Sequence, residues 1–259
     1  MNPTVTAQPI SSRQVRPHRR ATQSELAGRP EDFFQPSAMP KWAKLIVGVL
    51  LLPVCLGGAQ ALFRVLAQTG DAVTFWVAAV GGAACWLVIF LMLPKPMWVY
   101  VFGHELTHAL WTWLFGGRVK RFKVTSKGGH VVISKTNFLI TLAPYFFPLY
   151  VTLVILIFLL GDLVWNWTPY RVWFHFFIGA AYAFHVTLTW HILQTRQTDI
   201  TSQGHLFSGA VIFLGNLAVL LAGVPLLAER PDVPTAFAWW LHETGAVWMG
   251  LGRMIGRLF

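Results

Sequence analysis

Long stretches without charged residues limit what this chain can fold into. The runs 45–63, 73–93, 138–160, 172–193 and 206–228 contain no Asp, Glu, Lys or Arg. Each run is close to the roughly 20 residues that an α-helix needs to cross a bilayer. Charged residues make up only 12% of the chain, whereas soluble proteins contain about 25%. The sequence therefore predicts an all-α polytopic membrane protein.

A sixth apolar run, 97–115, differs from the others because it contains ionisable residues. Pro94-Lys95-Pro96 separates it from the run before, and Pro144 and Pro148 are predicted to kink the run that follows. We therefore expect about six transmembrane helices. The predicted organisation is a disordered basic tail (1–40), two accessory helices (41–96), a core (97–228) and an interfacial amphipathic C-terminal segment (229–259).

The segment 117–136 has a different character from its apolar neighbours. Val119, Phe122 and Val124 alternate with Lys and Arg, and Lys127-Gly128-Gly129 is typical of a turn. The residues from His130 to Ser134 then have the composition of a short strand. This pattern predicts a small β-hairpin directly after the sixth run.

The motif His104-Glu105-Leu106-Thr107-His108 lies inside run 97–115. Residues four apart face the same side of a helix, so the two imidazoles can bind one zinc ion. Glu105 lies beside them, where it can accept a proton from a water that the metal activates. Ionisable residues are costly inside a membrane, which favours a functional role over a chance match. The motif therefore predicts a Zn²⁺ site.

Two later residues could supply a third ligand, His185 and Asp199. If the helices of runs 97–115 and 172–193 are parallel, His108 lies about 20 Å from Lys95 along its helix, and His185 lies about 21 Å from Arg171. Asp199 would lie about 42 Å along if that helix continued. This geometry favours His185. Asp199 is the alternative, and it requires the chain to fold back between Gln194 and Gln203.

The segment from Met97 to Ala228 resembles the site-2 protease family of intramembrane zinc metalloproteases. The resemblance rests on the sequence from Phe102 to Ala109, and the predicted hairpin, Asn137 and Leu142-Ala143-Pro144 support it. In that family, two histidines and a later carboxylate bind zinc, a glutamate activates water, and an edge strand holds the substrate. The family's usual Leu-Asp-Gly sequence is absent, so the chain is a divergent relative. The resemblance implies metal binding by His104 and His108, catalysis by Glu105, and substrate contacts from His130, Val131, Val132 and Asn137.

These observations favour zinc-dependent proteolysis of transmembrane substrates within the lipid bilayer. The alternative is a non-enzymatic membrane scaffold or chaperone that keeps the motif for structural metal or helix packing. A transporter is less favoured, because the chain shows no matching pair of broken helices.

The net charge of +10 does not indicate nucleic-acid binding, because the basic residues gather beside apolar runs. Seven of the 20 Lys and Arg residues precede Leu45, and six lie between Arg118 and Lys135. With six spans, 12 of these charges fall on the side of the N-terminus and eight on the other side, which includes the hairpin. The excess predicts an integral protein of an inner or plasma membrane with a cytoplasmic N-terminus.

Overall fold

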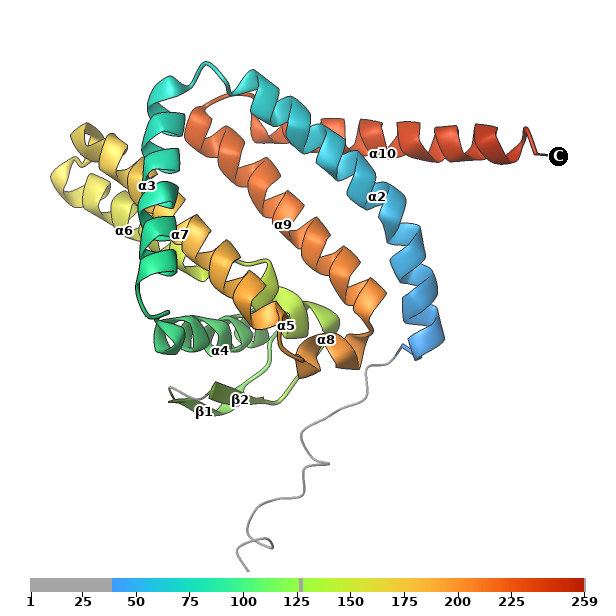
Figure 1. Cartoon of the computed structure of the whole chain (residues 1–259), viewed down its shortest axis with the longest axis horizontal. Coiled ribbons are helices and arrows are strands. Elements are labelled where there is room, and N and C mark those ends of the chain that lie inside the picture. Colours follow the sequence, from blue (N-terminus) through green and yellow to red (C-terminus); the bar gives the residue numbers. More distant parts are fainter. Residues whose placement is uncertain (1–38, 126–127, 259) are drawn as a thin grey trace, which may run out of the picture. The chain divides into compact units, whose positions relative to one another are not determined.

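The computed structural model describes residues 39–125 and 128–258 (Figure 1). The predicted tail, apart from its last two residues, lies outside this range, as do Ser126 and Lys127 of the predicted turn. The described chain is mostly helical, with one hairpin, as the sequence predicts. Four of its helices are long and apolar enough to cross a membrane. They are α2 (Lys41–Gln68), α3 (Val73–Met92), α7 (Arg171–Leu193, with the preceding turn η3, Thr168–Tyr170) and α9 (His205–Ala228).

Helices α2 and α9 pack together, and α10 (Val233–Ile255) packs across both. Ala61, Val65, Leu221 and Ala236 form a buried cluster where the three helices meet. A Cβ atom on Gly57 would overlap the Thr244 side chain and lie 2.5 Å from the Thr244 nitrogen, so the glycine lets α10 approach the α2 backbone. The C-terminal part of α10 projects away from the other helices (Figure 1).

A second group of helices is formed by α3, α7 and α6 (Leu149–Trp165). Helices α3 and α7 approach so closely that a Cβ atom on Gly82 would overlap the Phe176 carbonyl oxygen. A Cβ atom on Gly179 would overlap the Ala79 carbonyl oxygen in the same way. Small residues at a helix interface allow this backbone contact, which substitutes for the weak hydrophobic drive within a membrane.

The predicted span 138–160 is broken, as its two prolines indicate. Helix α5 (Phe138–Leu142) and the turn η2 (Ala143–Tyr145) precede α6, and the two parts are bent by 78°. Pro144 occupies the start of η2, and Pro148 precedes α6, where a missing N–H costs little. Counted as one span, this bent pair would make a fifth crossing.

The motif helix α4 (Met97–Leu114) is not among the candidate spans, so the prediction of six spans is not confirmed. Its polar motif lowers its hydropathy, and it lies crosswise at the lower end of α3 in Figure 1. Strands β1 (Val119–Thr125) and β2 (Gly128–Ile133) form the predicted antiparallel hairpin and pack against α4.

The hairpin lies at the same end of the described chain as the start of α2, whereas a count of six spans predicts that it lies on the side opposite the N-terminus. Lys44 of α2 donates a hydrogen bond to Gln203 of α8 (Thr198–Gln203), and α8 packs against α5, which contacts α4. The two placements differ because the prediction counts α4 as a crossing, and α4 is not among the candidate spans. We call α4, the hairpin, α5, η2 and α8 the site end. We call α2, α3, α6, α7, α9 and α10 the helical scaffold.

Candidate metal centre

Helix α4 places His104 and His108 one turn apart with their rings on the same side. Proline at position 96 fixes the start of this helix, and Gly116, with φ of 69°, follows its end. The ring centroids of the two histidines are 4.9 Å apart. Only 12% and 10% of the two side-chain surfaces are exposed, so both imidazoles are largely withdrawn from solvent.

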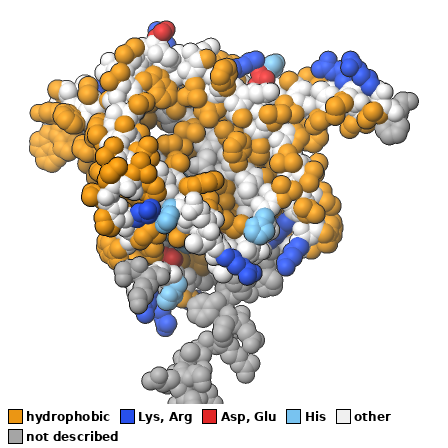
Figure 2. All heavy atoms as spheres, in the orientation of Figure 1, with side chains coloured by type: hydrophobic (Ala, Val, Ile, Leu, Met, Phe, Trp, Pro, Cys, Tyr) orange, Lys and Arg blue, Asp and Glu red, His pale blue; other side chains and the backbone are white. Residues whose placement is uncertain are grey.

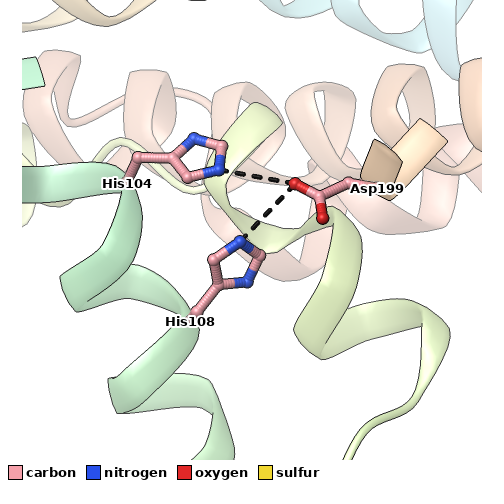
Figure 3. A group of neighbouring side chains, drawn as sticks. All are labelled: His104, His108 and Asp199. Carbon is pink, nitrogen blue, oxygen red and sulfur yellow. Dashed lines mark ion pairs between the residues drawn. The ribbon is translucent and has the colours of Figure 1, made fainter. Parts of the chain in front are cut away.

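Asp199 completes the group with its carboxylate (Figure 3). Its Oδ2 atom lies 3.4 Å from His104 Nε2 and 3.6 Å from His108 Nε2. The three ligand atoms lie within 4.8 Å of one another. The expectation that Asp199 lies at the far face is therefore wrong, whereas its assignment as a ligand remains a proposal.

Asp199 reaches the motif because the chain reverses after Leu193. Helix α7 ends there, and the Gln197 amide donates a hydrogen bond to the Ile192 carbonyl oxygen, which closes the turn. Helix α8 is only six residues long, and Gly204, with φ of 93°, redirects the chain into α9. Left-handed backbone of this kind favours glycine. The argument against Asp199 assumed that α7 continued straight and ran parallel to α4.

The hydrogen bonds of His108 are those of a metal ligand. Its Nδ1–H donates to the Ile140 carbonyl oxygen at 2.8 Å, which turns Nε2 toward Asp199. Ile140 lies in α5, and the Asn137 side chain caps this helix by accepting from the Ile140 N–H at 2.8 Å. Asn137, expected to contact substrate, is thus engaged in holding the carbonyl that orients His108.

Tyr145 is a site residue that the motif analysis missed. Its hydroxyl donates to Asp199 Oδ2 at 3.0 Å, and its ring contacts His104 edge-on. Only 1% of Tyr145 is exposed. The residue directly follows Leu142-Ala143-Pro144, but nothing in the sequence indicates that the turn η2 directs its hydroxyl to the motif.

The electrostatics of Asp199 favour its charged form. Burial alone would raise the pKa of this carboxyl, but the adjacent His104 and His108 imidazoles outweigh burial and hold the pKa below its ordinary value. A carboxylate beside two imidazole nitrogens is a donor set that zinc binds. The residues present therefore fit the metal that the motif implies.

Glu105 contacts the hairpin and also interacts electrostatically with His108 and Asp199. The Val131 backbone donates a hydrogen bond to its carboxylate, and a Cβ atom on Gly129 would lie 2.7 Å from Glu105 Cγ. Strand β2 therefore presents its outer edge to the motif glutamate. His130 is exposed, and Val131 and Val132 are half-buried.

His185, the favoured third ligand, does not belong to the group of three ligand atoms. It lies in α7 and lines a small cavity together with His104. A larger cavity, of about 630 Å³, lies between α6 and α7 at the other end of α7. Its lining includes Phe158, Trp167 and Phe174 and contains none of the group.

Comparison with known proteins gives one family. Residues 83–193 match the family model described as Peptidase M50B-like, which supports membership of the chain in the site-2 protease family. The matched segment includes the motif helix, the hairpin and α7, whereas Asp199 lies beyond it. No curated protein and no solved structure matches the chain. The matched family suggests a protease, and the apolar helices fit an integral membrane protein.

Proposed function

We propose that this protein is a zinc-dependent protease that cleaves transmembrane protein segments. The observation that carries the proposal is the convergence of His104, His108 and Asp199 beside Glu105. The first two come from the matched family segment, and the third reaches them through the reversal after α7.

The roles of the residues follow from their contacts. His104, His108 and Asp199 would hold the zinc ion, and Tyr145 fixes the Asp199 carboxylate by its hydrogen bond. When bound, zinc supplies Lewis-acid activation of water and of the peptide carbonyl group. Glu105 accepts the proton of the attacking water and delivers it to the departing amine.

The outer edge of β2 is the proposed binding place of the substrate. An extended peptide can add to an exposed strand edge through backbone hydrogen bonds. The Val131 N–H at this edge donates to Glu105, so a peptide that pairs along β2 would replace that hydrogen bond and would lie against the general base. The exposed His130 and the half-buried Val131 and Val132 would contact its side chains.

The orientation of the protein follows from the charges at the two ends. Among the described residues, nine of the 14 Lys and Arg residues belong to the site end or to the segments joined to it: Lys41, Lys44, Lys95, Arg118, Lys120, Arg121, Lys123, Lys135 and Arg196. The opposite end carries the remaining five: Arg64, Arg171, Arg230, Arg253 and Arg257. Figure 2 shows Lys and Arg side chains at the lower edge and along α10, with hydrophobic side chains between. Because basic segments stay inside, we propose that the N-terminus and the metal centre face the cytoplasm.

Cysteine labelling tests this orientation. After Cys55→Ala and Cys85→Ser, single cysteines are introduced by Lys123→Cys in the hairpin and Arg230→Cys at the opposite end. In intact cells, an impermeant maleimide should label only the Arg230→Cys variant, and both variants after permeabilisation. Labelling of Lys123→Cys in intact cells would place the site on the outer face.

Metal content tests the ligand assignment. Asp199→Ala should lower zinc affinity by more than the roughly 10- to 100-fold that outer-shell substitutions cost, as His108→Ala should. Asp162→Ala is the matched control, because Asp162 is half-buried, like Asp199, and accepts a hydrogen bond from Thr168 away from the site. Zinc retention by Asp199→Ala, with cleavage intact, would remove Asp199 from the proposed ligand set.

A further inference from the structure

The proposed ligand set does not explain how the second ring nitrogen of His104, Nδ1, is hydrogen-bonded. His108 donates its Nδ1–H to the Ile140 carbonyl oxygen. His104 Nδ1 is also buried, but it has no hydrogen-bond partner among the described residues. Histidines that bind metal through Nε2 carry their proton on Nδ1, and this N–H ordinarily donates to a carboxylate, a carbonyl or a water. The His104 Nδ1–H therefore needs an acceptor.

His185 offers an acceptor in the same place. Its Nε2 atom is buried and, within the part of the chain that the structure describes, has no partner either. His185 is 7% exposed, and both histidines line the same cavity. One buried nitrogen that must donate and one able to accept thus belong to two residues that line the same cavity.

The cavity has the size and lining that a single water needs. Its volume is about 20 Å³, measured for the centre of a water-sized sphere, whereas one ordered water needs roughly 10–15 Å³. Tyr150 also lines it, and this residue already donates its hydroxyl proton to the Val99 carbonyl oxygen. The Tyr150 oxygen can therefore accept a hydrogen bond but not donate one. A water here would have one donor and two acceptors around it, which suits its own lone pairs and hydrogens.

We propose that a water molecule in this cavity links His104 Nδ1–H to His185 Nε2, so that His185 is a positioning residue for the metal ligand His104. The inference rests on the proposed zinc site and deepens it. The water accepts from the His104 Nδ1–H and donates to His185 Nε2. This bridge fixes the tautomer of His104 and the orientation of its ring, as the direct bond to Ile140 does for His108.

The bridge accounts for the position of His185 outside the group of three ligand atoms. It also makes His185 different from His175, which occupies the same helix. His175 is equally buried, has an unpartnered Nδ1 among the described residues, and packs against Phe75 at the opposite end of α7. His175 is therefore a matched control for the loss of a buried imidazole from this helix.

Zinc affinity of the purified full chain, measured by competition with a chromophoric chelator, tests the proposal. His185→Leu should weaken zinc binding about 10- to 100-fold, the usual cost of losing an outer-shell partner. His185→Gln, which retains an acceptor, should recover most of this loss, and His175→Leu should leave the affinity unchanged. X-ray absorption of the zinc-loaded parent should count two imidazole ligands rather than three.

The outcomes separate this proposal from the proposed function. A parent that takes up no zinc overturns the function itself. Unchanged zinc affinity in His185→Leu, with the parent binding zinc, overturns the bridge alone. Three imidazoles in the parent, with His185→Leu as damaging as His108→Ala, would make His185 a ligand. If His185→Leu does not fold, two measurements still test the bridge: the number of imidazole ligands in the parent, and the zinc affinity of His185→Gln.

Discussion

The site end and the helical scaffold use the same chain in opposite ways. The scaffold consists of long apolar helices joined by close contacts between small residues, as at Gly82 and Gly179. The site end includes the short elements α5, η2 and α8, whose apolar residues Leu142, Tyr145 and Ile200 join a buried cluster with α9. Side-chain hydrogen bonds hold these elements, such as those of Asn137 and Tyr145.

Because the two regions are held by different contacts, we expect the scaffold to determine the stability of the fold and the site end to determine its chemistry. Lipid-facing helices gain little from apolar contact with one another, so backbone proximity determines how well the scaffold packs. At the site end, the polar contacts of Asn137 and Tyr145 hold the proposed zinc ligands. Substitutions in the scaffold should therefore lower the stability of the fold. Substitutions at the site end should lower zinc affinity or the rate of turnover.

The largest expected difference concerns two buried glutamates, one in each region. Glu105→Gln removes the proton acceptor but keeps the shape of the side chain and both imidazoles. Cleavage should fall about 10²- to 10⁴-fold while zinc stays bound. Glu243→Gln is the matched control, because Glu243 is buried between α10 and α2 and pairs with Arg64 at 2.6 Å. Its cleavage rate should match that of the parent.

Reconstituted proteoliposomes with a transmembrane peptide substrate provide the measurement for both glutamates, alongside zinc content. Equal cleavage by Glu105→Gln and the parent would remove the general base from the proposal. The structural-metal scaffold would then be the better reading of the motif.

The sequence predicts those features of the molecule that depend on residues close together in the chain. The motif, the hairpin and the kink at Pro144 and Pro148 are each determined by residues close together in the chain, and the structure has all three. The position of Asp199 depends instead on a reversal between two apolar helices. No residue pattern separates a reversal at Leu193 from a helix that ends at the membrane surface, so the distance argument chose His185.

The count of six spans is not confirmed for a related reason. Run 97–115 has the length of a crossing, but its polar residues reduce its hydropathy, and it is not among the candidate spans. That one helix decides on which side the hairpin lies. Tyr145 was missed because its contact with Asp199 joins residues 54 positions apart.

The next largest effect is expected in the scaffold, at two adjacent glycines of α3. Gly82→Ala would force the helix away from the Phe176 carbonyl oxygen, and overpacking of this kind typically costs about 1–3 kcal/mol. At Gly81 the nearest atom to an added Cβ is the Phe176 side chain at 3.9 Å, an ordinary contact. Gly81→Ala should therefore be neutral or slightly stabilising, because alanine favours helix.

Thermal unfolding in detergent micelles compares these two glycine variants. The folded fraction of Gly82→Ala should bind zinc as the parent does, since α3 contributes no ligand. Equal unfolding temperatures for the two variants would contradict the close approach of α3 and α7. A selective loss of zinc affinity would show instead that the scaffold and the site end are coupled.

The smallest expected effect compares two helix caps, one in each region. Asn137 caps α5, and Asp232 caps α10 by accepting from the Thr235 N–H at 2.7 Å. Asn137→Ala should cost about 1 kcal/mol of local stability. That loss should reach the metal, because α5 holds the Ile140 carbonyl that orients His108. Zinc affinity should fall by up to about tenfold, since about 1.4 kcal/mol corresponds to a factor of ten. Asp232→Ala should fray α10 and leave zinc affinity unchanged. Chelator competition on both variants measures this, and an equal response would mean that the Ile140 carbonyl holds its position without the cap.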